Sequence, residues 1–125
     1  MRNRFTGFTL IELLVVMAAL GLLLSVAAPR YAEHVDRARE VALKQNLQAI
    51  RDTLDKFYSD RARYPGSLQE LVKEGYLRLV PVDAITERAD TWVPVTQGNA
   101  TGGPITDIRS GAPGNSRDGS PSASW

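Results

Sequence analysis

Residues 7–16 read Gly-Phe-Thr-Leu-Ile-Glu-Leu-Leu-Val-Val, and they begin an apolar stretch, residues 8–28, that carries one charged side chain, Glu12. An α-helix of this length rises roughly 30 Å, which is the thickness of the hydrocarbon core of a bilayer. Arg2 and Arg4 precede the stretch. By the positive-inside rule they keep the amino terminus in the cytoplasm. We therefore expect a single membrane span, with the carboxy-terminal part of the chain on the far side of the membrane from the cytoplasm.

A secretory signal peptide and a plain signal anchor are the simplest alternatives for this stretch. Ser25-Val26-Ala27 is an acceptable cleavage site, but the apolar region is longer than the h-region of a signal peptide and contains a carboxylate. A charge at the centre of a span costs about 2.5–3.5 kcal/mol on insertion scales. A plain membrane anchor gains nothing that would offset this cost, so Glu12 argues against a plain anchor. A carboxylate within a span instead indicates a functional group that has a partner.

A short basic leader (residues 1–7), then Gly7, Phe8 and Glu12 in front of an unbroken apolar helix, resembles the class III signal of type IV pilins and type II secretion pseudopilins. This resemblance implies that a prepilin peptidase cleaves between Gly7 and Phe8 on the cytoplasmic face and methylates the new amino group of Phe8. Cleavage leaves an ammonium group about one helical turn before Glu12. In a filament, the Glu12 carboxylate of one subunit can pair with the Phe8 ammonium of its neighbour, which offsets the desolvation of both charges and sets the axial register.

The stem that follows the span is predicted to be an amphipathic helix over residues 29–63. Pro29 removes a backbone donor, which predicts a kink or local melting. The outer face carries favourable i,i+4 pairs such as Glu40 and Lys44. The apolar stripe at helical spacing, which we expect to face a small domain, consists of Val35, Ala38, Ala42, Leu47, Ile50, Leu54 and Phe57, with Leu43 and Tyr58 beside them.

Residues 64–125 are expected to form a small region packed on the stem. Ser67 and Glu70 have the spacing of a capping box, and Gly75 is placed to end the helix that they begin. A helix of about two turns is therefore predicted here. Tyr64-Pro65, this short helix, and then Tyr76-Leu77 and Pro81-Val82-Asp83 together resemble the same segment of the major pseudopilin of type II secretion.

Two strands are predicted at residues 91–95 and 105–109, separated by a glycine-rich turn. Pro94 places the first strand at an edge of the sheet. The carboxy-terminal residues are rich in glycine, proline and serine, so long loops are expected, with Trp125 docked on the domain. The predicted fold class is α+β, with a long amino-terminal helix packed on a small antiparallel sheet.

Composition excludes several functions. Fifteen basic and fourteen acidic residues leave a net charge of +1, so the basic surface of a nucleic-acid binder is not expected. The chain has no cysteine and one histidine, His34, which excludes disulfides, thiolate nucleophiles and multi-histidine metal sites. No triad pattern or phosphate-binding glycine loop is found, so we expect neither an enzyme nor a resident organic cofactor.

The family resemblance also implies calcium in the carboxy-terminal loop, where major pseudopilins bind it through aspartates, a serine and backbone carbonyls. Calcium takes about six to eight oxygen ligands. Asp118, Asp107 and Ser110 are the candidates in this chain, but Arg117 lies beside Asp118 and the loop departs from the acidic pattern of the family. A turn at Asp118 without a metal is the favoured interpretation.

We therefore predict a structural subunit, a pseudopilin that polymerises with itself and with other pseudopilins into the periplasmic filament of a type II secretion system. Its expected partners are the prepilin peptidase, the inner-membrane secretion platform and the lipid bilayer, and no nucleic acid. A minor pilin of a type IV pilus is one alternative, although such pilins often have a larger domain closed by a disulfide. A signal-anchored or secreted periplasmic binding protein is another, and a mature amino terminus near Ala28 would support it.

Overall fold

The computed structural model describes residues 7–99 and 101–125, so most of the predicted leader lies outside the described residues. The chain divides into two compact units, residues 1–36 and residues 37–125. In chain order, the elements are α1 (Leu10–Arg61), α2 (Leu68–Lys73), β1 (Val93–Thr96), the 3₁₀ turn η1 (Gln97–Asn99), β2 (Ile105–Arg109) and the 3₁₀ turn η2 (Ser122–Ser124). The predicted α+β class is confirmed.

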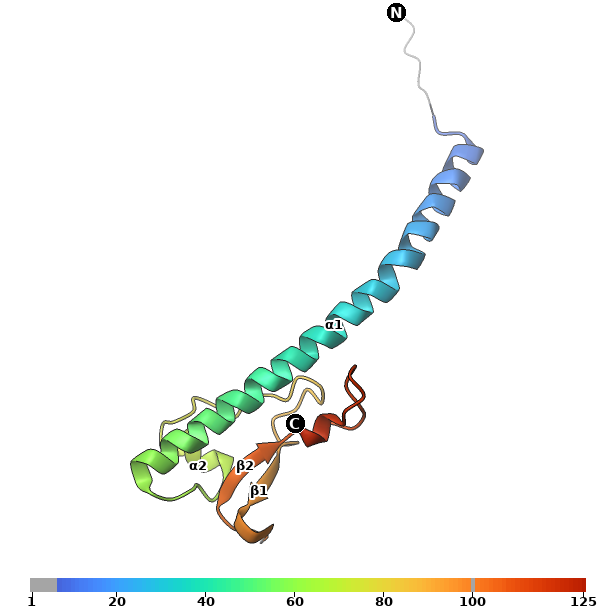
Figure 1. The fold of residues 1–125 in the computed structure, drawn as a ribbon. Coiled ribbons are helices and arrows are strands. Elements are labelled where there is room, and N and C mark those ends of the chain that lie inside the picture. The colour runs from blue at the N-terminus through green and yellow to red at the C-terminus, as the bar shows by residue number, and fades with distance from the viewer. Residues whose placement is uncertain (1–6, 100) are drawn as a thin grey trace, which may run out of the picture. The chain divides into compact units, whose positions relative to one another are not determined.

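In the first unit, α1 begins at Leu10 and carries the apolar span (Figure 1). By length and composition, α1 is long and apolar enough to cross a membrane. The helix is continuous through Pro29, so the local melting that this proline can cause is not observed. A kink at Pro29 stays a prediction.

The second unit is built on the stem part of α1, along which α2, β1 and β2 lie (Figure 1). The buried stripe of α1 follows the helical spacing that the sequence predicts, and it consists of Leu43, Leu47, Ile50, Leu54 and Phe57. These residues pack against Leu68, Leu71, Trp92, Ile105 and Ile108. Burial of this kind contributes about 1.5–3 kcal/mol for each large apolar side chain, so this cluster is the main source of the unit's stability.

The predicted stripe was placed too close to the span at one end. Ala38 is exposed and Ala42 is half-buried, because the buried core along α1 begins at Leu43. Tyr58 is also on the outer side of the helix, where its ring stacks on Tyr64 with 4.6 Å between the ring centroids.

The short helix α2 begins and ends as the sequence predicts. The Ser67 side chain accepts a hydrogen bond from the Glu70 backbone N–H at 3.2 Å. The Glu70 carboxylate accepts from the Gly66 N–H at 2.7 Å and from Arg63 at 2.7 Å, and these two donors lower the pKa of Glu70, the Arg63 bond more than the Gly66 bond. Gly75 follows the helix with φ = 82°, a conformation that glycine adopts without strain.

The sheet of the described residues has two antiparallel strands, β1 and β2. Strand β2 has the predicted bounds, and β1 begins two residues later than predicted, at Val93. Each strand has one neighbour, so the prediction that Pro94 lies in an edge strand is confirmed. Trp125 packs against the core, as expected for an aromatic residue at the end of a polar segment.

Candidate functional site

The start of α1 brings together the residues of the predicted processing signal. Gly7, Phe8 and Thr9 precede the helix, and the Phe8 side chain is 86% exposed. The Thr9 hydroxyl accepts a hydrogen bond from the Glu12 backbone N–H at 3.2 Å. The Glu12 carboxylate accepts in return from the Thr9 N–H at 3.4 Å. These reciprocal bonds are a capping box, in which two backbone donors at the helix start are satisfied by side chains.

The capping box gives Glu12 a second role that the sequence interpretation missed. Its signal is present in the sequence as the spacing Thr-x-x-Glu over residues 9–12. The carboxylate lies at the positive end of the helix dipole, where a negative charge is stabilised. Its bond to Thr9 is long, and an ionised carboxylate has about four acceptor positions. Glu12 therefore keeps capacity to accept from a further donor.

The span itself has an apolar surface that its own unit does not cover. The large apolar side chains between Phe8 and Val26 are 46% to 86% exposed. A contiguous apolar surface of this size requires lipid or the helices of other subunits around it. Glu12 is the charged side chain within this surface.

The structure does not bring the calcium candidates together into one ligand set. Asp107 forms an ion pair with Arg51, in which the Asp107 Oδ1 lies 2.8 Å from the Arg51 Nε. The Ser110 hydroxyl donates to Asp83 at 2.5 Å. Within the described residues, no group of three or more acidic or histidine side chains is placed to hold a metal ion.

Asp118 is the centre of a separate turn. Its Oδ1 accepts from the hydroxyl of Ser116, and from the backbone N–H and hydroxyl of Ser120 at 2.8 and 2.5 Å. These donors, first Ser116 and then Ser120, lower the pKa of Asp118 to about 2, and the charge of Lys44 adds a smaller effect. The turn is also closed by the bridge between Asn115 and Pro121.

Asp83 is a buried anchor, a role that the sequence interpretation did not assign to it. Its side chain is fully buried, and it accepts from the backbone N–H groups of Ile85 and Thr86 at 2.8 and 3.2 Å as well as from Ser110. The backbone just before it is held to the stem, because Asn46 donates to the Val82 carbonyl at 2.9 Å. Asp83 therefore joins the loop that leads to β1 with the loop that follows β2.

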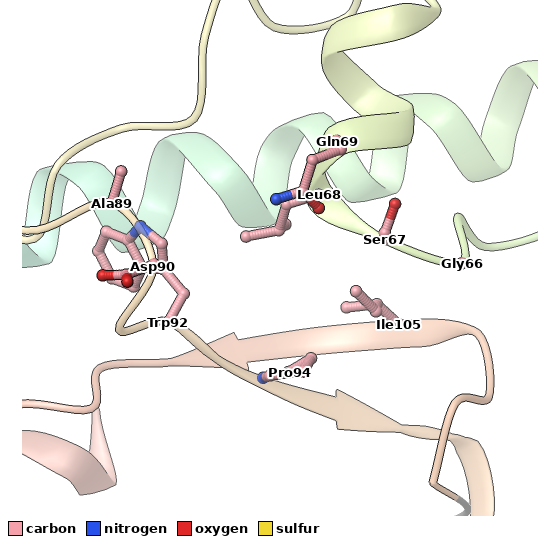
Figure 2. Close-up of a pocket in the computed structure, with 9 residues that line it drawn as sticks. All are labelled: Gly66, Ser67, Leu68, Gln69, Ala89, Asp90, Trp92, Pro94 and Ile105. Atoms are coloured by element: carbon pink, nitrogen blue, oxygen red, sulfur yellow. The ribbon is translucent and has the colours of Figure 1, made fainter.

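A shallow hollow of about 260 Å³ lies between the start of α2 and strand β1 (Figure 2). Leu68, Trp92, Pro94 and Ile105 supply its apolar wall, and its ionisable group is Asp90. The Asp90 carboxylate is already paired with Arg88, at 2.6 and 2.8 Å. The hollow has no arrangement of nucleophile and base that would carry chemistry.

The class of protein is indicated by the match of the amino-terminal segment to a known family model. Residues 2–28 match the family model described as the prokaryotic N-terminal methylation motif. This range includes Gly7, Phe8 and Glu12, and the match assigns the chain to the prepilin-type proteins.

The relatives define the family. The chain is 31% identical to the type II secretion system core protein G of Pseudomonas aeruginosa over 78% of this chain and 80% of that protein. It is 32% identical to the core protein G of Klebsiella pneumoniae over 65% of this chain and 69% of that protein. It is also 37% identical to the type IV major pilin protein PilA of Myxococcus xanthus, but over 56% of this chain and 31% of that pilin. No solved structure matches the chain.

The chain belongs to the type II secretion system core protein G family. It is a pseudopilin that is processed by a prepilin peptidase and anchored in the inner membrane by its apolar helix. Members of this family are structural subunits that assemble with other pseudopilins.

Proposed function

We propose that the chain is cut between Gly7 and Phe8, is methylated at Phe8, and stacks by its exposed span into the periplasmic filament of a type II secretion system. The amino terminus lies in the cytoplasm and residues 37–125 lie in the periplasm. The chain does no chemistry of its own, and a separate cytoplasmic ATPase supplies the energy through the inner-membrane platform. The filament drives protein export by growing against its cargo.

The observation that supports this proposal is the placement of Glu12 at the start of an exposed apolar span. Among the described residues, the Glu12 carboxylate accepts a long hydrogen bond, 3.4 Å, from the Thr9 N–H of its own chain. Release of Phe8 as an ammonium group provides a far stronger partner in the neighbouring subunit, since charge-assisted hydrogen bonds are roughly twice as strong as neutral ones. Pairing of the Glu12 carboxylate with the Phe8 ammonium stabilises one axial register between neighbouring subunits.

The first experiment is the mass and amino-terminal sequence of the mature protein, purified from cells with and without the prepilin peptidase. We expect a chain that begins at methylated Phe8 in the presence of the peptidase and an uncut chain in its absence. A mature chain that begins near Ala28 would contradict the proposal and favour an exported binding protein.

The second experiment replaces Glu12 by glutamine, with Glu33→Gln, an exposed position of α1 beyond the span, as the matched control. Glutamine keeps the cap acceptor but cannot form an ion pair with the Phe8 ammonium. We expect E12Q to be cleaved normally and to form few or no filaments, while E33Q forms them as the wild type does. Normal filaments of E12Q in electron micrographs would refute the role given to Glu12.

A minor subunit of a type IV pilus is the second candidate, and the match to the Myxococcus xanthus pilin is the observation in its favour. The two functions are separated by deleting the gene. Loss of protein export with intact pili supports the secretion filament, and loss of pili with intact export supports the pilus.

A further inference from the structure

The loop that follows β2 is fastened at its end by a lysine of the stem. The Lys44 ammonium lies over the Trp125 ring, with Nζ 4.3 Å from the ring centroid. The indole N–H of Trp125 donates to the Ser120 hydroxyl at 3.0 Å, and that hydroxyl donates to Asp118. A continuous path of contacts therefore runs from the stem through the last residue of the chain to the turn at Asp118.

Several side-chain oxygen atoms of this turn already take part in hydrogen bonds. Asp118 Oδ1 accepts from Ser116 and Ser120, and the Ser120 hydroxyl in turn accepts from the Trp125 indole. A hydroxyl group that donates to one neighbour and accepts from another keeps one of its two lone pairs, so it can offer a cation at most one contact. Calcium needs about six to eight oxygens, usually with several carboxylates, and this turn supplies one carboxylate.

The charges around Asp118 also oppose a divalent cation. The adjoining surface hollow is lined by Arg37, Glu40, Lys44, Arg117 and Asp118, so three basic side chains outnumber two carboxylates. Glu40 is engaged as well, because its Oε1 accepts from the Arg117 backbone N–H at 2.9 Å. A calcium ion placed beside Asp118 would be repelled by Lys44 and Arg117.

We infer that the carboxy-terminal loop of this chain is held closed without a metal ion. The contact between the Lys44 ammonium and the Trp125 ring takes the place of the calcium ion that the family resemblance implies. The other two candidate ligands do not compete with this assignment, since Asp107 is held by Arg51 and Ser110 by Asp83. The stem supplies the cation, which is the Lys44 ammonium. The hydroxyls of Ser116 and Ser120 supply the hydrogen bonds that stabilise the charge of the Asp118 carboxylate.

The test uses the full chain in detergent micelles, with calcium chloride as the probe and magnesium chloride as the ionic control. Thermal unfolding is followed by tryptophan fluorescence, and the two indole N–H resonances are followed by NMR, with the Trp125 signal assigned from a Trp125→Phe sample. A site with a dissociation constant of about 1 mM would raise the Tm by several degrees at about 10 mM calcium. We expect calcium, magnesium and a chelator to give the same Tm within about 1 °C and the same Trp125 resonance.

Two variants test the role of the lysine. Lys44→Met keeps the apolar part of the side chain and removes the charge, and we expect it to lower the Tm by about 2–8 °C and to shift the Trp125 resonance. Lys56→Met, at another exposed lysine of the same helix, is the matched control and should change neither. A Tm that rises with calcium but not with magnesium, or equal behaviour of the two variants, would overturn the inference.

Discussion

Replacing Asp83 by alanine removes the acceptor that holds two loops of the periplasmic unit together. The buried carboxyl accepts from Ser110 at 2.5 Å and from the backbone N–H groups of Ile85 and Thr86 at 2.8 and 3.2 Å. Each buried donor that loses its partner costs about 1–3 kcal/mol, and these costs are not fully additive because the donors are neighbours. We expect Asp83→Ala to reduce the free energy of unfolding by about 3–4 kcal/mol.

For a unit of this size, each kcal/mol changes the Tm by about 4–8 °C, so the expected fall is about 12–32 °C. The assay is urea and thermal unfolding of the full chain in micelles, followed by tryptophan fluorescence, because Trp92 is in the affected core and its indole donates to the Pro81 carbonyl at 2.7 Å. Helical circular dichroism is a poorer probe, since the exposed span of α1 dominates it.

Two milder variants test whether the hydrogen bonds of Asp83 are the source of the lost stability. Asp83→Asn keeps one oxygen for the backbone donors, and its amide can donate to the Ser110 hydroxyl, so a loss of about 1 kcal/mol is expected. Ser110→Ala removes one partner and should cost about 1–3 kcal/mol. If Asp83→Asn proves as damaging as Asp83→Ala, the hydrogen bonds are not the source of the stability, and a loss below about 1 kcal/mol in Asp83→Ala would refute the anchor altogether.

The other predictions concern single positions of the same unit. A Cβ atom on Gly111 would lie 2.2 Å from the Thr91 carbonyl oxygen, so Gly111→Ala should lose about 2–3 kcal/mol in urea unfolding, and a neutral result would contradict this contact. The pKa of Asp118 is lowered to about 2, so its stabilising effect is complete above about pH 4 and is lost as the pH falls towards 2. Asp118→Asn should abolish that part of the pH dependence of the Tm, and an unchanged acid profile would exclude it. Ala62 follows the last residue of α1 and has φ = 54°, so Ala62→Gly should raise the Tm by about 2–8 °C, because the strain that it relieves exceeds the added chain entropy.

The features that could be predicted from the sequence are those encoded by local patterns. The apolar span, the stripe from Leu47 to Phe57 and the capping box of α2 at Ser67 each follow from spacing within one element. Strand β2 follows from its β-branched residues between glycine-rich segments. These patterns determine each element before any long-range contact is made.

The features that the sequence interpretation missed depend on contacts between distant segments. Asp83 and Ser110 are 27 positions apart, and neither residue type indicates burial by itself. Glu40 and Lys44 have the spacing of a helical ion pair, but the structure engages Glu40 with the Arg117 backbone and Lys44 with Trp125. A tertiary partner that is close and well oriented outcompetes an exposed i,i+4 pair, whose stabilisation is only about 0.2–0.5 kcal/mol.

The helix start at Thr9 has a consequence for how the membrane protease meets its substrate. The proposed scissile bond, between Gly7 and Phe8, lies outside α1, and the hydrogen bonds of the cap begin at Thr9. An extended backbone can therefore enter the protease while the span remains helical in the lipid. Hydrolysis of that bond also leaves the Thr9–Glu12 cap in place, so the newly made subunit keeps its helix intact from the moment the leader departs.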